Sequence, residues 1–289
     1  MAIINFANAV MADGPVGYWR LGDPIPNDYS YPWGIKDETA NGNGGAVIDS
    51  VGDNVFDPVG GITGPSGIKF RQPGLHGGLF IPRFPVGDTA ALFDGKTGRI
   101  IVLNSDSLNP QYLTMEALIR WDGPNPGLTQ YQQRILEKSS YPEVAQYSLS
   151  INTDGKIRVE LRVAHAPPAP DTWAVAESNT VVSQGVETYV AATYDGSVIQ
   201  IYVNPPNTPP VYNSSQTDPN GPGTISPKPP TPANLIESGA GIGNQTQRNR
   251  PFHGLIDEVA LYPSALSADK ILAHYRSQFT FLIPVPPRP

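Results

Sequence analysis

The amino-acid sequence predicts an all-β sandwich, and three observations lead to this fold class. The chain of 289 residues contains 32 Pro and 29 Gly, which disfavour long helices. Several segments alternate between apolar and polar residues with the period of two that a half-buried strand requires. Asp-Gly pairs lie within such segments, where they form the turns of hairpins. All-β chains of this length are often one domain, so we expect a single domain over residues 1–279 and a Pro-rich tail over residues 280–289.

The first part of the chain is expected to form one opening strand, then long loops, then a series of strands. The opening strand should end near Asp23. Residues 24–88 are rich in Gly, Pro, Asn and Asp, which predicts long loops draped over the sandwich. Further strands are expected at residues 99–103, 113–121, 134–138 and 146–151.

Two hairpins are predicted in the middle of the chain. Residues 151–161 turn at Asp154-Gly155, and residues 189–203 turn at Asp195-Gly196. A second long loop, rich in Pro, follows at residues 204–234 and lengthens a connection between strands. Loops of this length inside a compact domain are usually functional or disordered.

The last strand and the only expected helix are adjacent near the C-terminus. Alternation over residues 255–262 predicts a strand with two largely apolar faces, as in a strand covered on both sides. Asp257 and Glu258 are neighbours, so we expect them on opposite faces, each with a partner that offsets the cost of its burial. Ser267 is expected to cap a short helix that runs to about Ser277, with Asp269 in its first turn.

Three segments carry a resemblance to a known family. Residues 252–271 read FHGLIDEVALYPSALSADKI, residues 12–23 read ADGPVGYWRLGD and residues 89–95 read TAALFDG. In this order they resemble the closing strand and helix, the opening strand and the next strand entry of laminin-G-like domains of the concanavalin A-like lectin/glucanase superfamily. The resemblance implies a jelly-roll β-sandwich with long loops and one short C-terminal helix. It says much less about the ligand, because many functions share this fold.

The same resemblance implies a calcium ion. Domains of this family often hold calcium, which takes oxygen ligands from Asp side chains and backbone carbonyls. Asp257 is the strongest candidate, with Asp23 and Asp94 as partners. The alternative is that Asp94 shapes an Asp-Gly turn, Asp23 caps the strand end and Asp257 accepts hydrogen bonds from backbone amides.

Catalysis is not expected. The E-x-D-x-x-E pattern that places two carboxylates on one face of a glucanase strand is missing from the sequence. No H-E-x-x-H or G-x-S-x-G motif is present, and the four histidines are expected on the surface or in loops. These histidines are His76, His165, His253 and His274. If hydrolysis were observed, the acids to test as members of a catalytic pair would be Glu116, Glu137 and Glu160.

Exposed aromatic residues are the candidates for glycan binding, because pyranose C–H surfaces pack on aromatic rings. The candidates in predicted loops are Tyr29, Tyr31, Trp33 and Trp173. The alternative is that these rings pin the loops to the sandwich or fill a subunit interface. Trp19 and Trp121 lie on predicted strands, so we expect them in the core.

Composition narrows the partners and the setting. The formal charge of −7, without a Lys/Arg cluster, disfavours nucleic acid, and no segment is long and apolar enough to insert in a membrane. The chain has no Cys, and its first residues do not resemble a Sec signal peptide. With the family resemblance, these features suggest a virion or extracellular surface protein, for example a bacteriophage tail fibre or capsid decoration that forms a homo-oligomer with other virion proteins.

Two functions remain open from the sequence. The first is a non-enzymatic, lectin-like protein that binds glycans or another feature of a host cell surface. The second is a purely structural decoration or fibre subunit that stabilises an assembly without binding glycans.

Overall fold

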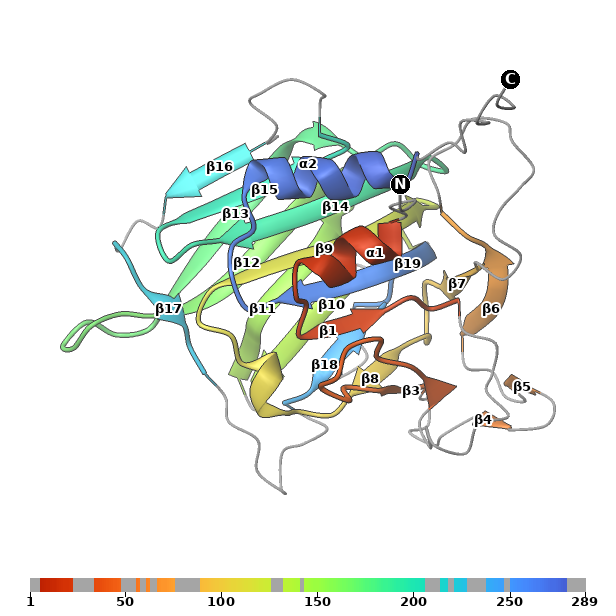
Figure 1. The fold of residues 1–289 in the computed structure, drawn as a ribbon, viewed down its shortest axis with the longest axis horizontal. Coiled ribbons are helices and arrows are strands. Elements are labelled where there is room, and N and C mark those ends of the chain that lie inside the picture. The colour runs from red at the N-terminus through yellow and green to blue at the C-terminus, as the bar shows by residue number, and fades with distance from the viewer. Residues whose placement is uncertain are drawn as a thin grey trace, which may run out of the picture.

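The computed structural model is a sandwich of two antiparallel β-sheets, and the described part of the chain has two α-helices on its outside (Figure 1). This agrees with the predicted fold class. The tail at 280–289 and most of the loop at 24–88 lie outside the described part, and the boundary at residue 279 stays a prediction. The structure describes residues 6–22, 34–47, 56–57, 61–62, 67–75, 89–125, 132–140, 143–205, 214–217, 221–227, 238–246 and 250–279.

One sheet, here called sheet A, contains the C-terminal strand at its centre. Its eight described strands pair in the order β16-β15-β14-β9-β19-β7-β6, with β1 paired to the end of β19. Their bounds are β1 Gly17–Trp19, β6 Ile68–Pro73, β7 Thr89–Asp94, β9 Leu113–Trp121, β14 Glu187–Tyr194, β15 Val198–Val203, β16 Ser214–Thr217 and β19 His253–Tyr262.

The second sheet, sheet B, packs against sheet A. Its nine described strands pair in the order β13-β12-β11-β10-β18-β8-β3-β2, with β17 paired to the end of β12. Their bounds are β2 Gly34–Ile35, β3 Gly45–Val47, β8 Ile100–Val102, β10 Gln132–Ser140, β11 Glu143–Asn152, β12 Lys156–Ala164, β13 Thr172–Val181, β17 Thr224–Ile225 and β18 Ala240–Ile242. A separate short pair, β4 Phe56–Asp57 and β5 Gly61–Ile62, and a 3-10 turn at Asp106–Leu108 complete the described elements.

The main core lies between the two sheets. It is built from the inward residues of strands whose side chains alternate, as in β12, where Ile157, Val159 and Leu161 are buried between more exposed neighbours. Trp19 and Trp121 are only 0% and 3% exposed and belong to this core, as predicted.

A second apolar cluster covers the outer face of sheet A. Two helices, α1 (Phe6–Ala12) and α2 (Ala268–Ser277), lie across this face in Figure 1. Phe6 and Val10 of α1, spaced by one helical turn, pack there with Ile271 and Leu272 of α2. Sheet A is therefore buried on both faces, which explains the two apolar faces of β19.

The C-terminal helix was predicted correctly and the N-terminal helix was not. The hydroxyl of Ser267 accepts a hydrogen bond from the N–H of Lys270, as expected for a helix cap. The expected opening strand is limited to β1, because the chain before it forms α1 and turns at Gly14, whose φ is +69°. Seven residues carry too weak a periodic signal to predict a helix that forms only against sheet A.

Both predicted hairpins are present. β11 and β12 pair across Gly155, and β14 and β15 pair across Gly196. These two glycines have φ of +82° and +101°, a backbone conformation that residues with a Cβ rarely adopt. The two Asp-Gly pairs were sufficient to predict these hairpins, because the conformation of a hairpin turn depends mainly on the residues in the turn.

A β-bulge in β19 changes the predicted directions of its acids. The pairing of β19 with β9 shifts between Asp257 and Ala260, and Glu258 has a φ of +52°. Asp257 contacts Leu75, and Glu258 contacts Tyr18, both on the outer face of sheet A. The expectation that the two acids face opposite sides is therefore wrong, because a bulge adds one residue and resets the alternation.

Candidate functional site

The predicted calcium ligand Asp94 has a clear role in a turn. It ends β7, and its Oδ1 accepts hydrogen bonds from the N–H groups of Lys96 at 2.8 Å and Thr97 at 2.9 Å. The chain turns at Gly95, between Asp94 and Lys96, and this glycine has a φ of +71°. This arrangement matches the alternative in which Asp94 shapes an Asp-Gly turn.

The two described candidate ligands do not share a site. Asp257 is fully buried, and its Oδ2 accepts a hydrogen bond of 3.0 Å from the N–H of Leu75. In the β19–β7 ladder the residue opposite Asp94 is His253, four positions before Asp257, which separates the two acids by about 13 Å along the strand. Asp23 lies outside the described residues. Within the described ranges no group of three or more His, Cys, Asp or Glu could hold a metal ion.

One histidine is in the interior and corrects the expectation that all four are in loops or on the surface. His274 on α2 is 1% exposed and reaches Glu116 on β9, which is fully buried on the outer face of sheet A. Its Nδ1 lies 3.1 Å from Oε2 of Glu116, and its Nε2 lies 3.0 Å from Oδ2 of Asp13. The sequence did not reveal this, because the partners are 158 and 261 residues away in the chain.

Opposite charges and hydrogen bonds offset the cost of burying the cluster around Glu116 and His274. Glu116 also accepts hydrogen bonds from the hydroxyls of Tyr189, at 2.6 Å, and Tyr262. Burial alone would lower the pKa of His274, but the carboxylates of Glu116 and Asp13 outweigh burial and raise it above its ordinary value. Burial and Glu116 together raise the pKa of both tyrosines, which keeps their hydroxyls protonated as donors. The cluster fastens α2 and the end of α1 to sheet A.

The remaining histidines and the second acid of β19 also have defined places. His165 and His253 are half-buried, at the end of β12 and the start of β19, and His76 lies outside the described residues. Glu258 is fully buried, accepts a hydrogen bond from the hydroxyl of Tyr18 and pairs with Arg20 at 3.0 Å. The buried acids thus have the partners that their burial requires.

The outer face of sheet B is polar, in contrast to that of sheet A. Residues on alternate positions of β12 and β13, and on either side of an irregularity in β10, form what we call the polar face. They are Arg134, Glu137, Arg158, Glu160, Arg162, Trp173 and Glu177. The alternation of charged and apolar residues over 156–164 was visible in the sequence as a hairpin strand, but the sequence did not show that its charged residues join those of β10 and β13 on one face.

Ion pairs join the charged side chains of the polar face. Arg134 lies 2.5 Å from Glu137 and 3.0 Å from Glu160, and Arg158 lies 3.0 Å from Glu160 and 2.7 Å from Glu177. Burial would raise the pKa of Glu160, but Arg134 and Arg158 more than offset this effect and lower it. A carboxyl group held ionised in this way is a poor proton donor, so Glu160 is unsuited to act as a general acid.

The polar face is closed at one end and open at the other. At the closed end, Gln245 donates a hydrogen bond to Glu137, whose side chain is only 1% exposed. At the open end Trp173 is 40% exposed and lies directly opposite Arg162 across the β12–β13 ladder. Asp171 accepts hydrogen bonds from Nε of Arg162 at 3.2 Å and from the hydroxyl of Ser226 at 2.7 Å.

Of the four predicted glycan-binding residues, the structure describes only Trp173, and it lies on β13 rather than in a loop as expected. Its ring is exposed beside a guanidinium and a carboxylate, an arrangement that can pack on a sugar ring and exchange hydrogen bonds with its hydroxyls. Tyr29, Tyr31 and Trp33 lie outside the described residues, so their role stays a prediction. No helix in the described part of the chain is long and apolar enough to cross a bilayer.

Comparison with known protein families identifies one match. A family model described as "Concanavalin A-like lectin/glucanases superfamily" matches residues 94–272, which is more than half of the chain. A search of curated proteins found no match.

Solved structures share the fold at low sequence identity. The binding domain of Paraclostridial Mosquitocidal Protein 1 is 13% identical, with a TM-score of 0.58 over 93% of this chain and 53% of that one. Domain 4 of AbnA, a GH43 extracellular arabinanase from Geobacillus stearothermophilus in complex with arabinotriose, is 16% identical, with a TM-score of 0.51 over 90% and 98%. The botulinum neurotoxin serotype G binding domain is 13% identical, with a TM-score of 0.53 over 92% and 51%. This chain therefore spans about half the length of the two toxin domains.

Proposed function

The chain belongs to the concanavalin A-like lectin/glucanases superfamily, and from this premise we propose that it is a non-enzymatic, lectin-like module that binds a glycan at the open end of its polar face. The observation that carries the proposal is the exposed ring of Trp173 beside Arg162 and Asp171. An exposed large aromatic side chain on a strand has no packing role on its free side, and sugar C–H surfaces bind to such rings.

Three features support binding rather than catalysis. Glu160 is held ionised by two arginines, and Glu137 lies in the closed, buried end of the face. Glu116 is fully buried beneath α2, on the opposite side of the molecule from these acids. Related folds include two toxin binding domains and a domain solved with arabinotriose, which supports a ligand-binding use of this scaffold.

We also propose a setting at a virion or other extracellular surface, as a bacteriophage fibre or capsid decoration that binds a host cell. The cysteine-free composition suits delivery by assembly rather than by secretion, and the Pro-rich segments suit packing between subunits in a homo-oligomer or with other virion proteins. Weak binding by one site would then be strengthened by several copies on one particle.

Replacing Trp173 with Ala should reduce binding to glycans or host cells about tenfold, which corresponds to about 1.4 kcal/mol. The change removes the ring but leaves the sheet intact, because Trp173 is exposed. Retention of the purified protein on a glycan array and on cells would measure the effect.

Val181→Ala is the matched control, since Val181 is exposed at the other end of the same strand. Equal binding by wild type and Trp173→Ala would contradict the proposed site. If adsorption were unchanged while the oligomer became less stable, the purely structural function would be favoured instead.

Calcium binding at Asp257 is a further proposal that rests on the family resemblance. Chelation should lower the melting temperature of the wild type and change that of Asp257→Ala little, because a bound ion stabilises only the folded state that holds it. Asp171→Ala serves as the control, because Asp171 accepts a hydrogen bond from Arg162 at the open end of the polar face and lies away from β19. Equal sensitivity of wild type and Asp257→Ala would remove Asp257 from the site. No sensitivity in either protein would favour the alternative in which Asp257 accepts hydrogen bonds from backbone amides, such as that of Leu75.

A further inference from the structure

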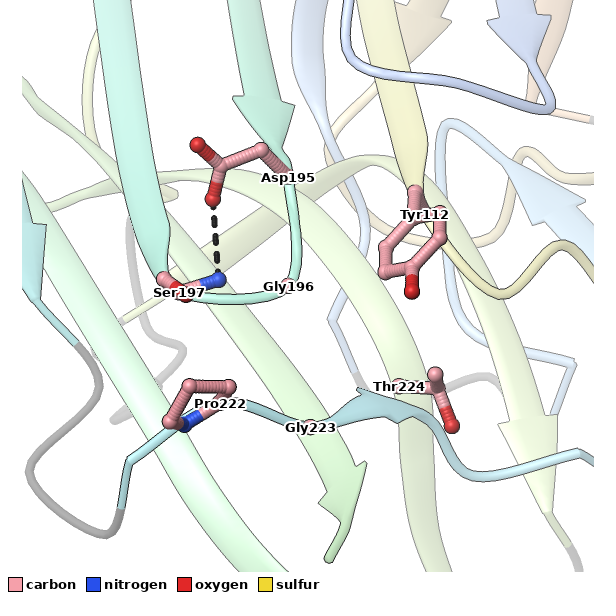
Figure 2. Close-up of a pocket in the computed structure, with 7 residues that line it drawn as sticks. All are labelled: Tyr112, Asp195, Gly196, Ser197, Pro222, Gly223 and Thr224. Atoms are coloured by element: carbon pink, nitrogen blue, oxygen red, sulfur yellow. Dashed lines mark hydrogen bonds between the residues drawn. The ribbon is translucent and has the colours of Figure 1, made fainter.

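A pocket opens at one end of the sandwich, and none of the polar-face residues is among those that line it. It has a volume of about 260 Å³ and lies where the β14–β15 turn meets the residue before β9 and the start of β17. Figure 2 shows Tyr112 and Thr224 on one side and Asp195, Ser197 and Pro222 on the other. A space of this size is near the lower limit of small-molecule sites, which suits a single sugar unit better than a long chain.

Two of the residues that line this pocket are glycines, Gly196 and Gly223. The N–H of Gly223 donates a hydrogen bond of 2.8 Å to the carbonyl of Gly196, which joins the turn to the segment before β17. A Cβ at Gly196 would lie 2.7 Å from the ring of Tyr112, and a Cβ at Gly223 would lie 2.5 Å from Val163. The missing side chain at Gly196 leaves room for the ring of Tyr112 beside the turn, and the missing side chain at Gly223 lets this segment lie close to Val163 of β12.

The walls of the pocket carry polar groups around an exposed ring. Tyr112 is 38% exposed. Oδ1 of Asp195 accepts hydrogen bonds of 2.8 Å from the N–H groups of Ser197 and Val198, which fixes the carboxylate in place. Among the described residues, Oδ2 of Asp195 and the hydroxyls of Tyr112, Ser197 and Thr224 make no hydrogen bond with the protein.

The charge of the pocket restricts its ligand. Asp195 is the acidic residue that lines it, and no Lys or Arg is among the lining residues. An ionised carboxylate accepts hydrogen bonds from sugar hydroxyls but repels the carboxylate or sulfate of an acidic sugar. The chain as a whole has a net charge of −7, which acts in the same direction.

We propose that this pocket is a second glycan site that takes one neutral sugar unit, stacked on Tyr112 and hydrogen-bonded through its hydroxyls to Asp195 and Thr224. This second site rests on the proposed function, because its ligand is also a glycan, but the residues that form it do not include Trp173. Sugar contact with an aromatic ring and a fixed carboxylate selects neutral sugars over acidic ones.

The test uses the full chain on an array of neutral, sialylated, uronate-containing and sulfated oligosaccharides, followed by titration with arabinotriose and the best neutral glycan. Wild type should prefer neutral glycans. Tyr112→Ala should weaken that binding about fivefold or more, and Asp195→Asn, which can still accept the two turn hydrogen bonds, should narrow the difference between neutral and acidic glycans. Melting temperatures would show that both variants stay folded.

The outcomes separate this inference from the proposed function. If Trp173→Ala weakens binding while Tyr112→Ala and Asp195→Asn behave as wild type, the pocket is not a sugar site and the polar face stands alone. A preference of wild type for acidic glycans would also overturn the inference. If no glycan binds wild type at all, both proposals fail together.

Discussion

Replacing Glu116 with Ala should lower the free energy of unfolding by about 3–5 kcal/mol, the usual cost of breaking a buried charged pair. The change leaves the hydroxyls of Tyr189 and Tyr262 and the ring of His274 without their shared acceptor in a region closed to water. Chemical denaturation at neutral pH, followed by tryptophan fluorescence, measures the effect. Glu187→Ala is the control, because Glu187 is exposed at the start of β14.

The same cluster should make stability depend on pH. The folded state raises the pKa of His274 above its unfolded value of about 6.5, so its contribution is fully present below that pH and is lost as the pH rises through the folded pKa. The groups that face His274 are Glu116, Asp13 and Tyr262, with Lys270 paired to Asp13 at 2.7 Å.

Unfolding free energies of wild type and His274→Gln, measured from pH 6 to pH 9, should therefore converge as the pH rises. A difference in unfolding free energy between the two proteins that stays constant over this pH range would show that His274 is not charged in the folded state.

For Glu116→Ala, a loss of unfolding free energy of less than about 1 kcal/mol would show that the cluster does not fasten α2 to sheet A.

Arg134→Ala should have the second largest effect, also about 3–5 kcal/mol, because it leaves Glu137 without its closest cation in a buried position. The side chains of Arg134 and Glu137 are only 4% and 1% exposed. Arg158→Ala is the matched comparison on the same face, since its side chain is 24% exposed and surface pairs contribute about 0–1 kcal/mol.

A double-mutant cycle separates charge from packing. Glu137→Gln in the Arg134→Ala background should recover part of the loss, because the uncompensated buried charge is then removed. Similar losses in Arg134→Ala and Arg158→Ala, or no recovery in the double variant, would contradict a buried ion pair as the source of the effect. Thermal unfolding of five proteins at one ionic strength provides the comparison: wild type, Arg134→Ala, Glu137→Gln, the double variant and Arg158→Ala.

Local signals in the sequence were enough for the parts of the fold that depend on neighbouring residues. The Asp154-Gly155 and Asp195-Gly196 turns, the Ser267 cap and the alternation of β12 each involve residues close in the chain. The family motifs at both ends of the chain also predicted the sandwich. The ring of Trp173 is exposed, but the residue lies on β13 and not in the loop that the preceding Pro-rich turn suggested.

The tertiary structure alone decided the features that join distant segments. The bulge at Glu258, the burial of His274 and the contact of Arg134 with Glu160 depend on which strands pair and which helices cover them. The pocket at Tyr112 forms because the β14–β15 turn meets the segment before β17. The physical reason is that hydrophobic alternation identifies which side of a strand is apolar, whereas the position of a charged group relative to its partners is set only when the sheets pack.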